Sequence, residues 1–342
     1  MIVDLPLIWG GILALAVLLY VVLDGFDLGI GILFPFATDK QRDTMMASIA
    51  PVWDGNETWL VLGGAGLFVA FPNAYAVLMP ALYLPVTMML AGLILRGVAF
   101  EFRLHGRSRG RVFWTWAFAG GSLAAALAQG FVLGGFIQGV QVRLGQFAGG
   151  PLDWATPYTL VVALGLMAGY VLLGASWLMI KTEGDLHALA RKWALRAAPA
   201  VAVILAAVSV ATLFLHPLVA LRWGVGPQGV DAQRFLPLLP IPLMGAFGLL
   251  MAFAGARAKD GHPHTPLVGG FLAFLSGYLG LAVGFLPFIV PYAMTYEEAA
   301  SSPGALKMML GGTAVLLPLI LGYSGWVYWV FRGKVGEDAG YH

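Results

Sequence analysis

Long apolar runs constrain this chain more than any other feature of its sequence. Stretches of about twenty or more mostly apolar residues recur from the first residues to the last, and the mean hydropathy is +0.85. One such stretch, as a helix, crosses the roughly 30 Å hydrocarbon core of a bilayer. The alternation over about ten residues that is typical of a membrane β-barrel strand is absent. We therefore expect an all-α polytopic membrane protein without a sizeable soluble domain.

We predict nine transmembrane helices in a single integral membrane domain, residues 1–342. Turns that contain Pro, Gly, Asn and Asp separate the apolar runs. The third run contains Pro80 and Pro85, so we expect a kink there. The first run has no basic segment before it and exceeds the apolar part of a signal peptide, so we expect it to remain as a span. The predicted helices cover residues 5–36, 54–71, 75–101, 112–139, 157–180, 197–217, 236–256, 266–290 and 306–331.

The distribution of basic residues predicts the orientation of the chain. Fourteen of the 19 Lys and Arg residues lie on the side reached after the odd-numbered spans, four lie on the other side, and Arg96 lies within the third span. Short cytoplasmic loops of membrane proteins carry the excess of Lys and Arg. We therefore expect a periplasmic N-terminus and a cytoplasmic C-terminus.

The sequence offers few residues that could hold a metal or a haem. Cysteine is absent, which excludes disulfides, thiolate catalysis and Cys-held clusters. None of the 6 histidines lies in the middle of a predicted span, where a haem would need an axial ligand. His262 and His264 flank a proline in a short loop, which is a poor metal site. We expect no metal, cofactor or redox centre in this chain, and no nucleic-acid partner.

Three charged clusters lie within the first third of the chain. The first pair is three residues apart, so its members share a helix face. At 1.5 Å per residue this pair lies about 26 Å along its helix, close to the cytoplasmic edge of the bilayer. The predicted orientation brings all three clusters to that edge, on three consecutive spans. The clusters are Asp24 with Asp27, Asp54 with Glu57, and Arg96 with Glu101 and Arg103.

These clusters have a structural and a functional interpretation. Asp54 and Glu57 have the spacing of a capping box with Asp54 as the N-cap residue. Arg103 fits an ordinary positive-inside anchor, whereas Arg96 lies at least one turn inside the edge and needs a carboxylate or carbonyl partner. Together, the residues favour a proton-accepting cluster that opens to the cytoplasm. Close glycine pairs such as Gly25 and Gly29 indicate tight helix contacts, within the bundle or at a subunit interface.

Three classes of protein fit such a cluster. It could serve a helper subunit of a larger proton-consuming complex or a stand-alone proton-coupled secondary transporter, or it could belong to a purely structural assembly subunit. A transporter is expected to hold its site near the membrane midplane on broken helices. The charges here lie at the membrane edge, which disfavours that class.

The same segments resemble a known family. The motifs DGFDLGIG from Asp24, SIAPVWDGNETWL from Ser48 and RGVAFEFR from Arg96 are similar to those of subunit II of cytochrome bd-type quinol oxidases. The letters NET and FEFR lean toward the cyanide-insensitive branch. Residues 20–105 carry most of the resemblance, and the later helices fit in number and hydropathy.

The resemblance implies a terminal oxidase of the respiratory chain in the bacterial inner membrane. In that family a haem-bearing subunit I carries two b-type haems and one d-type haem, and it oxidises quinol at the outer face. Subunit II is haem-free, and the heterodimer reduces dioxygen to water with protons from the cytoplasm. The implied partners are subunit I, lipid and quinone, with a small single-helix subunit in some members. A quinone bound to subunit II occurs in some relatives.

The resemblance also assigns roles to individual residues. It implies a proton pathway toward the haems through acids of the motifs, among which Glu101 takes the acid position after the span-three arginine. Arg96 and Arg103 are expected to tune the charge of these acids. Trp59 is similar to a residue that lines an apolar oxygen path in some members. The pathway residues that the resemblance implies are Asp24, Asp27, Asp54 and Glu101, and the charged cluster adds Glu57 to them.

Overall fold

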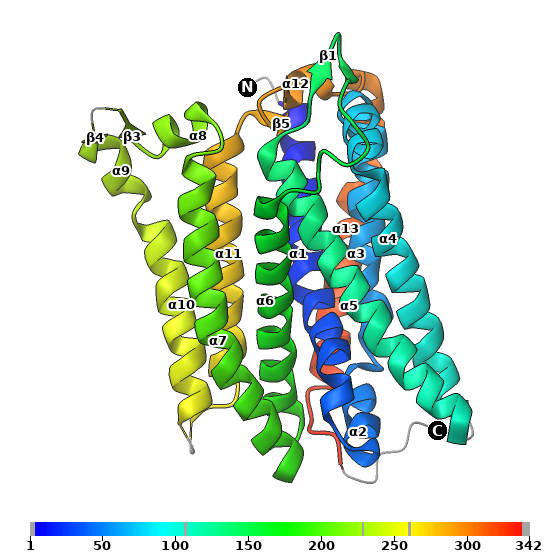
Figure 1. Ribbon diagram of the computed structural model, residues 1–342. Helices are drawn as coiled ribbons and strands as arrows, with labels where there is room; N and C mark the ends of the chain where they lie inside the picture. Colours follow the sequence, from blue (N-terminus) through cyan, green and yellow to red (C-terminus); the bar gives the residue numbers. More distant parts are fainter. Residues whose placement is uncertain (1–3, 106–107, 228, 259–260, 337–342) are drawn as a thin grey trace.

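The long helices of this protein run side by side along one common direction (Figure 1). The computed structural model describes residues 4–105, 108–227, 229–258 and 261–336, so Arg107 and Lys259, counted among the basic residues above, lie outside it. The two ends of the chain lie at opposite ends of the bundle (Figure 1). The long helices are α1 (Leu5–Leu33), α3 (Trp53–Ala70), α4 (Pro72–His105), α5 (Ser108–Gln138), α6 (Pro157–Lys181), α7 (Gly184–Leu213), α10 (Pro240–Arg257), α11 (Thr265–Phe285) and α13 (Pro303–Val330).

Short elements connect the long helices. The described strands form antiparallel hairpins at the end of the bundle where the N-terminus lies (Figure 1). The hairpins are β1 (Val142–Arg143) with β2 (Gln146–Phe147), β3 (Val225–Gly226) with β4 (Gly229–Val230), and β5 (Phe288–Val290) with β6 (Met294–Thr295). The short helices are η1 (Phe34–Phe36), α2 (Asp39–Ile49), α8 (Pro217–Arg222), α9 (Ala232–Leu238) and α12 (Tyr296–Ala299).

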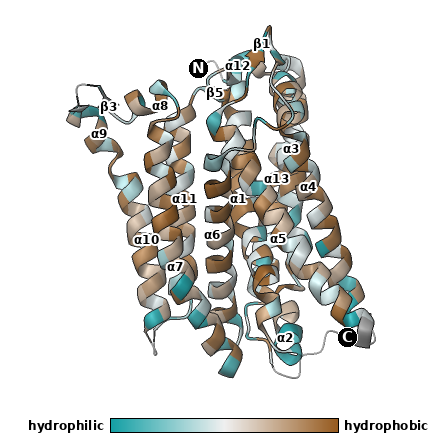
Figure 2. Cartoon of the chain, viewed as in Figure 1, coloured by the Kyte–Doolittle hydropathy of each residue, from teal (hydrophilic) through white to brown (hydrophobic). Residues whose placement is uncertain are grey.

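The helices confirm a multi-pass membrane protein. In the described part of the chain, 8 helices are long and apolar enough to cross a membrane. Hydrophobic residues dominate the middle of the long helices, and hydrophilic residues gather near their ends (Figure 2). Helix α3 also has 18 residues and packs on α1, but Asp54, Asn56 and Glu57 make its first turn polar. The ninth span therefore stays a prediction.

Two predicted boundaries differ from the structure by five residues or more. Helix α7 begins at Gly184 instead of 197, because the polar segment before the apolar run is rich in Ala, Leu, Lys and Arg, which favour helix. Helix α11 ends at Phe285 instead of 290, because Pro287 lacks a backbone N–H and the chain continues as β5. The predicted kink in α4 is confirmed: Leu82, between the two prolines, has φ −118° and ψ 16°.

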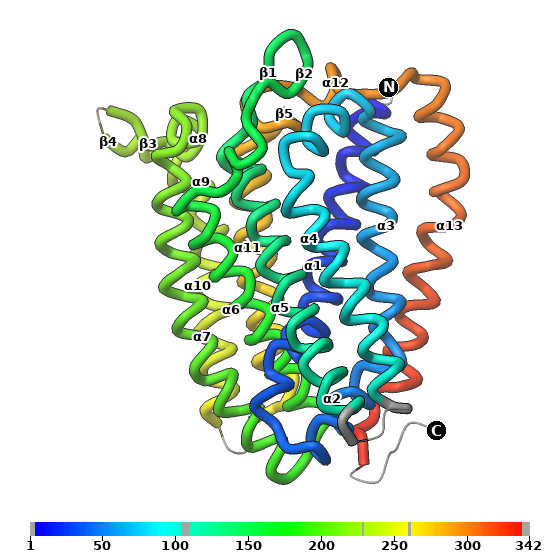
Figure 3. The backbone as a smooth tube through the Cα atoms, turned by 45° about the vertical axis from the view of Figure 1, so that its right-hand side comes forward, coloured from blue at the N-terminus to red at the C-terminus, as the bar shows by residue number. Residues whose placement is uncertain are grey.

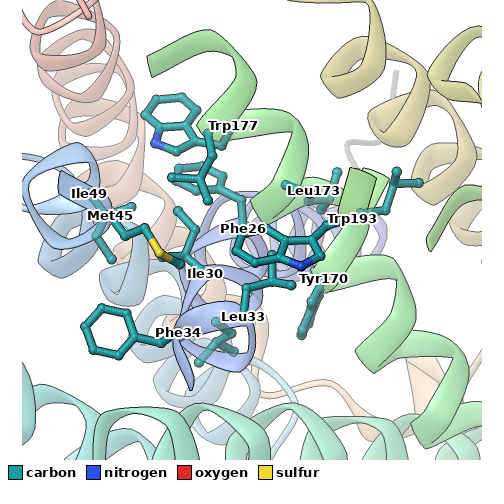
Figure 4. Close-up of a cluster of buried hydrophobic side chains, with 14 of the residues drawn as sticks. Phe26, Ile30, Leu33, Phe34, Met45, Ile49, Tyr170, Leu173, Trp177 and Trp193 are labelled. Atoms are coloured by element: carbon teal, nitrogen blue, oxygen red, sulfur yellow. The ribbon is translucent and has the colours of Figure 1, made fainter. Parts of the chain in front are cut away.

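Helix α1 is central and packs on α3, α5 and α6. A Cβ atom on Gly29 would overlap the carbonyl oxygen of Tyr170, so α1 and α6 approach as closely as a glycine allows. Next to this contact Phe26 stacks on Trp177 with ring centroids 4.4 Å apart, within the buried apolar cluster that Figure 4 shows. Helix α13 lies at the outside of the bundle beside α3 (Figure 3).

Candidate functional site

The guanidinium of Arg96 lies at the centre of a buried polar cluster. It donates hydrogen bonds to Asp24 on α1 and to Glu57 on α3, with 3.1 Å between Nη1 and Glu57 Oε2. Its Cζ atom lies 5.3 Å from the centroid of the Trp53 ring. The side chains of Arg96 and Asp24 are 1% and 0% exposed. A cation buried this deeply is unfavourable without partners, and two carboxylates and an aromatic face provide them.

The second buried aspartate, Asp27, has neutral partners. Its Oδ2 accepts a hydrogen bond from Asn56 Nδ2 at 2.8 Å, and Asn56 Oδ1 accepts one from the Tyr328 hydroxyl at 2.7 Å. Asn56 therefore links α1 and α3 to the end of α13. Asp24 Oδ2 and Asp27 Oδ1 are buried and accept no hydrogen bond from the described residues. Asp27 thus keeps one oxygen at which a proton can bind.

The start of α3 excludes the capping box. The N-cap residue is Val52, and no side chain caps the helix. Asp54 lies exposed in the first turn, while Glu57 turns inward to Arg96. The capping interpretation of this pair is therefore wrong, because the helix begins before Asp54 and Glu57 already has a buried cation as partner.

The predicted pathway acids differ in exposure. Asp54 and Glu101 are exposed, the Glu57 side chain is 29% exposed, and Asp24 and Asp27 are fully buried. In the described part of the chain no three His, Asp or Glu side chains are arranged to hold a metal ion. Chemically, the arrangement offers carboxyl groups that range from solvent-accessible to buried around one cation.

The structure places Arg103 in a different cluster. Its Nη1 donates to Asp43 on α2 at 2.7 Å, and its Nε donates to Thr115 on α5 at 3.0 Å. Arg111 binds the same Asp43 carboxylate at 2.5 Å. Helix α2, which the hydropathy pattern did not indicate, supplies this carboxylate. Arg96 and Arg103 therefore do not share partners.

Trp59 lies one turn beyond Asn56 on α3. It is 2% exposed and packs with Ala16 and Tyr20 of α1. Its indole Nε1 has no hydrogen-bond acceptor among the described residues. Trp59 is thus buried among largely apolar side chains, and its role in an oxygen path stays a prediction.

Several polar partners escaped the sequence analysis. Asn56 stands inside a quoted motif, yet nothing in the motif indicates that its amide joins Asp27 to Tyr328. Gln129 is an uncharged polar residue in the middle of an apolar run, and such a residue is a reason to search for buried partners. Nothing in the sequence indicated that Tyr328 belongs to the site, because a tyrosine near the end of a span is typical of an interfacial aromatic belt.

Comparisons with known proteins agree with this architecture. A family model for cytochrome bd terminal oxidase subunit II matches residues 5–331. The chain is 28% identical over 365 aligned positions to the cytochrome bd-I ubiquinol oxidase subunit 2 of Escherichia coli (strain K12), with 98% of this chain and 96% of the relative covered. It is 27% identical over 346 positions to the cytochrome bd ubiquinol oxidase subunit 2 of Bacillus subtilis, with 96% of each covered.

A solved structure shares the fold. A chain in the structure of bd oxidase from Geobacillus thermodenitrificans has a TM-score of 0.73 with this chain at 14% identity, and the match covers 96% of this chain and 98% of the other. The family model covers almost all of the helical bundle, including the Arg96 cluster. We conclude that this multi-pass membrane protein belongs to the cytochrome bd terminal oxidase subunit II family.

Proposed function

We propose that this chain is the haem-free subunit II of a cytochrome bd-type quinol:dioxygen oxidoreductase in the bacterial inner membrane. Its partner is a haem-bearing subunit I with two b-type haems and one d-type haem, which oxidises quinol and reduces dioxygen to water. The names of the relatives, both ubiquinol oxidase subunits, support quinol as the substrate. A bound quinone and a small single-helix subunit are further components of the proposed complex.

The proposed contribution of this chain is a proton-uptake route from the cytoplasm toward subunit I. The buried cluster around Arg96 is the observation that carries this proposal. The carboxyl groups of Asp24 and Glu57 bind the guanidinium, and that of the buried Asp27 lies one helical turn after Asp24 on α1. If all three were ionised, the cluster would hold a net negative charge in a low-dielectric environment, which is unfavourable. Proton uptake relieves that charge, so the cluster is suited to store and pass on a proton.

The order of exposure gives the route a direction. Asp54 and Glu101 collect protons at the surface, Glu57 lies at the boundary, and Asp24 and Asp27 lie inside. Arg96 orients the inner carboxylates and limits their charge. Arg103 acts at a distance, by holding α2 and the end of α4 in place. Trp59 lines an apolar path for dioxygen in this proposal.

Turnover of the intact two-subunit complex tests the route. We expect Asp27→Asn, Glu57→Gln and Asp54→Asn each to slow quinol-driven oxygen uptake, by about tenfold or more for the buried Asp27. The b- and d-type haem bands in the visible spectrum should stay normal. Asp231→Asn is the matched control: this exposed acid caps α9 at the other end of the bundle, and Asn keeps the cap.

Each contrary outcome points to one alternative. Unchanged turnover in all three cluster variants would leave a purely structural subunit. Loss of the haem bands together with turnover would indicate a role in assembly. A colourless chain that purifies folded and without a haem-bearing partner would contradict the oxidase assignment and favour a stand-alone transporter.

A further inference from the structure

The two buried aspartates of the cluster have unequal surroundings. Asp24 contacts the permanently charged guanidinium of Arg96. Asp27 receives one hydrogen bond, from the neutral amide of Asn56. A hydrogen bond from a charged donor stabilises a carboxylate about twice as strongly as one from a neutral donor. The contacts alone therefore favour the ionised form at Asp24 more than at Asp27.

A second polar network ends one helical turn before Asp24, at Tyr20 of α1. The Tyr170 hydroxyl on α6 donates to Gln129 Oε1 on α5 at 2.6 Å, and Gln129 Nε2 donates to the Tyr20 hydroxyl oxygen at 2.5 Å. All three side chains are at most 7% exposed. An amide has one acceptor and one donor end, so this chain of hydrogen bonds has a direction. The oxygen of Tyr20 accepts, which leaves its hydroxyl hydrogen for another acceptor.

Asp24 is the acceptor that suits this hydrogen. It follows Tyr20 by one helical turn on α1, so the two side chains share a face of the helix. Asp24 Oδ2 accepts no other hydrogen bond from the described residues. A hydroxyl hydrogen rotates toward the nearest negative charge, and an oriented chain strengthens that preference. In the reverse orientation Tyr20 would donate to Gln129, and a buried carboxylate oxygen would lack a donor.

We propose that Asp24 and Asp27 have separate roles in the proposed proton route, on which this inference rests. Asp24 stays ionised as the counter-charge of Arg96, and Tyr20 and Gln129 are positioning residues that hold it so. Asp27 is the carboxyl group that takes up and releases the proton, at the Oδ1 atom that has no donor. Uptake forms an O–H bond there with a proton from the cytoplasmic side, and release toward subunit I breaks it. No electron moves in this chain.

The groups that face Asp24 come from five helices. One cation and two further carboxyl groups are among them, and three tyrosines complete the set. They are Tyr20 and Asp27 on α1, Glu57 on α3, Arg96 on α4, Tyr170 on α6 and Tyr328 on α13. The pH at which Asp24 binds a proton depends on all of these groups, so the effect of one hydrogen-bond donor is measured by removing that donor alone.

Infrared pH-difference spectroscopy of the intact oxidase measures which of the two aspartates is protonated. The C=O stretch of a protonated carboxyl group is visible without turnover. At pH 7 we expect a protonated-carboxyl band that Asp27→Asn removes and Asp24→Asn keeps. In Tyr20→Phe the protonated-carboxyl band of Asp24 should appear at a pH about one unit higher than in the parent. This band is assigned to Asp24 by its loss in the double variant Tyr20→Phe with Asp24→Asn. Tyr158→Phe is the control, since that hydroxyl bonds Thr212 outside the cluster.

Gln129→Met provides a second variant if Tyr20→Phe does not assemble. It removes both amide hydrogen bonds at similar volume, so we expect a smaller shift of the Asp24 band in the same direction. A band that disappears in Asp24→Asn instead of Asp27→Asn would overturn the proposal. So would a Tyr20→Phe spectrum that matches the Tyr158→Phe control.

The spectra separate this inference from the proposed function. If Asp27→Asn removes the band but leaves turnover unchanged, the proton route is wrong and the separate protonation states stand. If Asp27→Asn slows turnover but leaves the band in place, the route stands and the division of roles is wrong.

Discussion

Replacing Arg96 by methionine should destabilise the protein in a way that depends on pH. Methionine keeps the length and apolar volume of the arginine stem but removes the charge. Asp24, fully buried, is left without a cation, whereas Glu57 is 29% exposed and retains water as a partner. The energetic consequence therefore falls mainly on Asp24.

The loss of stability is set by whichever state of Asp24, ionised or protonated, has the lower free energy in the variant. Leaving the carboxylate ionised and unpaired in the interior costs about 3–5 kcal/mol. Binding a proton instead costs an ordinary aspartate about 1.4 kcal/mol for each pH unit above about 3.9, which is about 4 kcal/mol at pH 7 and about 1.5 kcal/mol at pH 5. The destabilisation should thus shrink as the pH falls. Loss of the contact with the Trp53 ring adds about 1 kcal/mol at either pH.

Thermal unfolding of the intact complex at pH 5 and pH 7 measures this difference. The double variant Arg96→Met with Asp24→Asn should recover most of the stability lost at pH 7, because no unpaired charge remains. Arg222→Met is the matched control. Arg222 donates to the Gly284 carbonyl at 2.8 Å and lies over the Phe288 ring at 5.7 Å, without a carboxylate partner among the described residues. A double variant as unstable as the single one, or equal losses at both pH values, would refute the reasoning.

Three further variants test other parts of the structure. Gly29→Ala places a Cβ atom in the backbone of α6 and should destabilise the complex by about 3 kcal/mol in thermal unfolding, whereas Gly11→Ala, with no atom within 4 Å, should not. Arg103→Lys keeps a cation for Asp43 but cannot also donate to Thr115, and should lower stability by about 1–2 kcal/mol, with the pH dependence of turnover unchanged because it lies outside the Arg96 cluster. Tyr328→Phe frees the amide of Asn56 and should slow oxygen uptake; turnover equal to wild type would show that this bond does not position Asp27.

Many residues of the candidate site could be predicted from the sequence, but few of the contacts between them could. Charged residues within or beside membrane spans are rare because burying a charge is energetically unfavourable, so Asp24, Asp27 and Arg96 could each be recognised from the sequence. Their pairing could not. Whether Glu57 caps its own helix or reaches Arg96 depends on where α3 begins and how it is rotated against α4, and hydropathy reports neither. The same ambiguity hid the partner of Arg103.

The sequence by itself determined the class of the protein. In lipid the backbone must form its hydrogen bonds within a helix, and the side chains must be apolar over the thickness of the bilayer, which requires a long apolar run. The sequence also determined the motifs that identify the family, since these are contiguous. Only the tertiary structure decided which polar side chains meet. The Tyr20–Gln129–Tyr170 network joins three helices, and Asn56 connects Asp27 to Tyr328, which follows Asn56 by 272 residues. Such pairs follow from helix rotation and close glycine contacts, which depend on the packing of the whole bundle and are not contained in any local pattern.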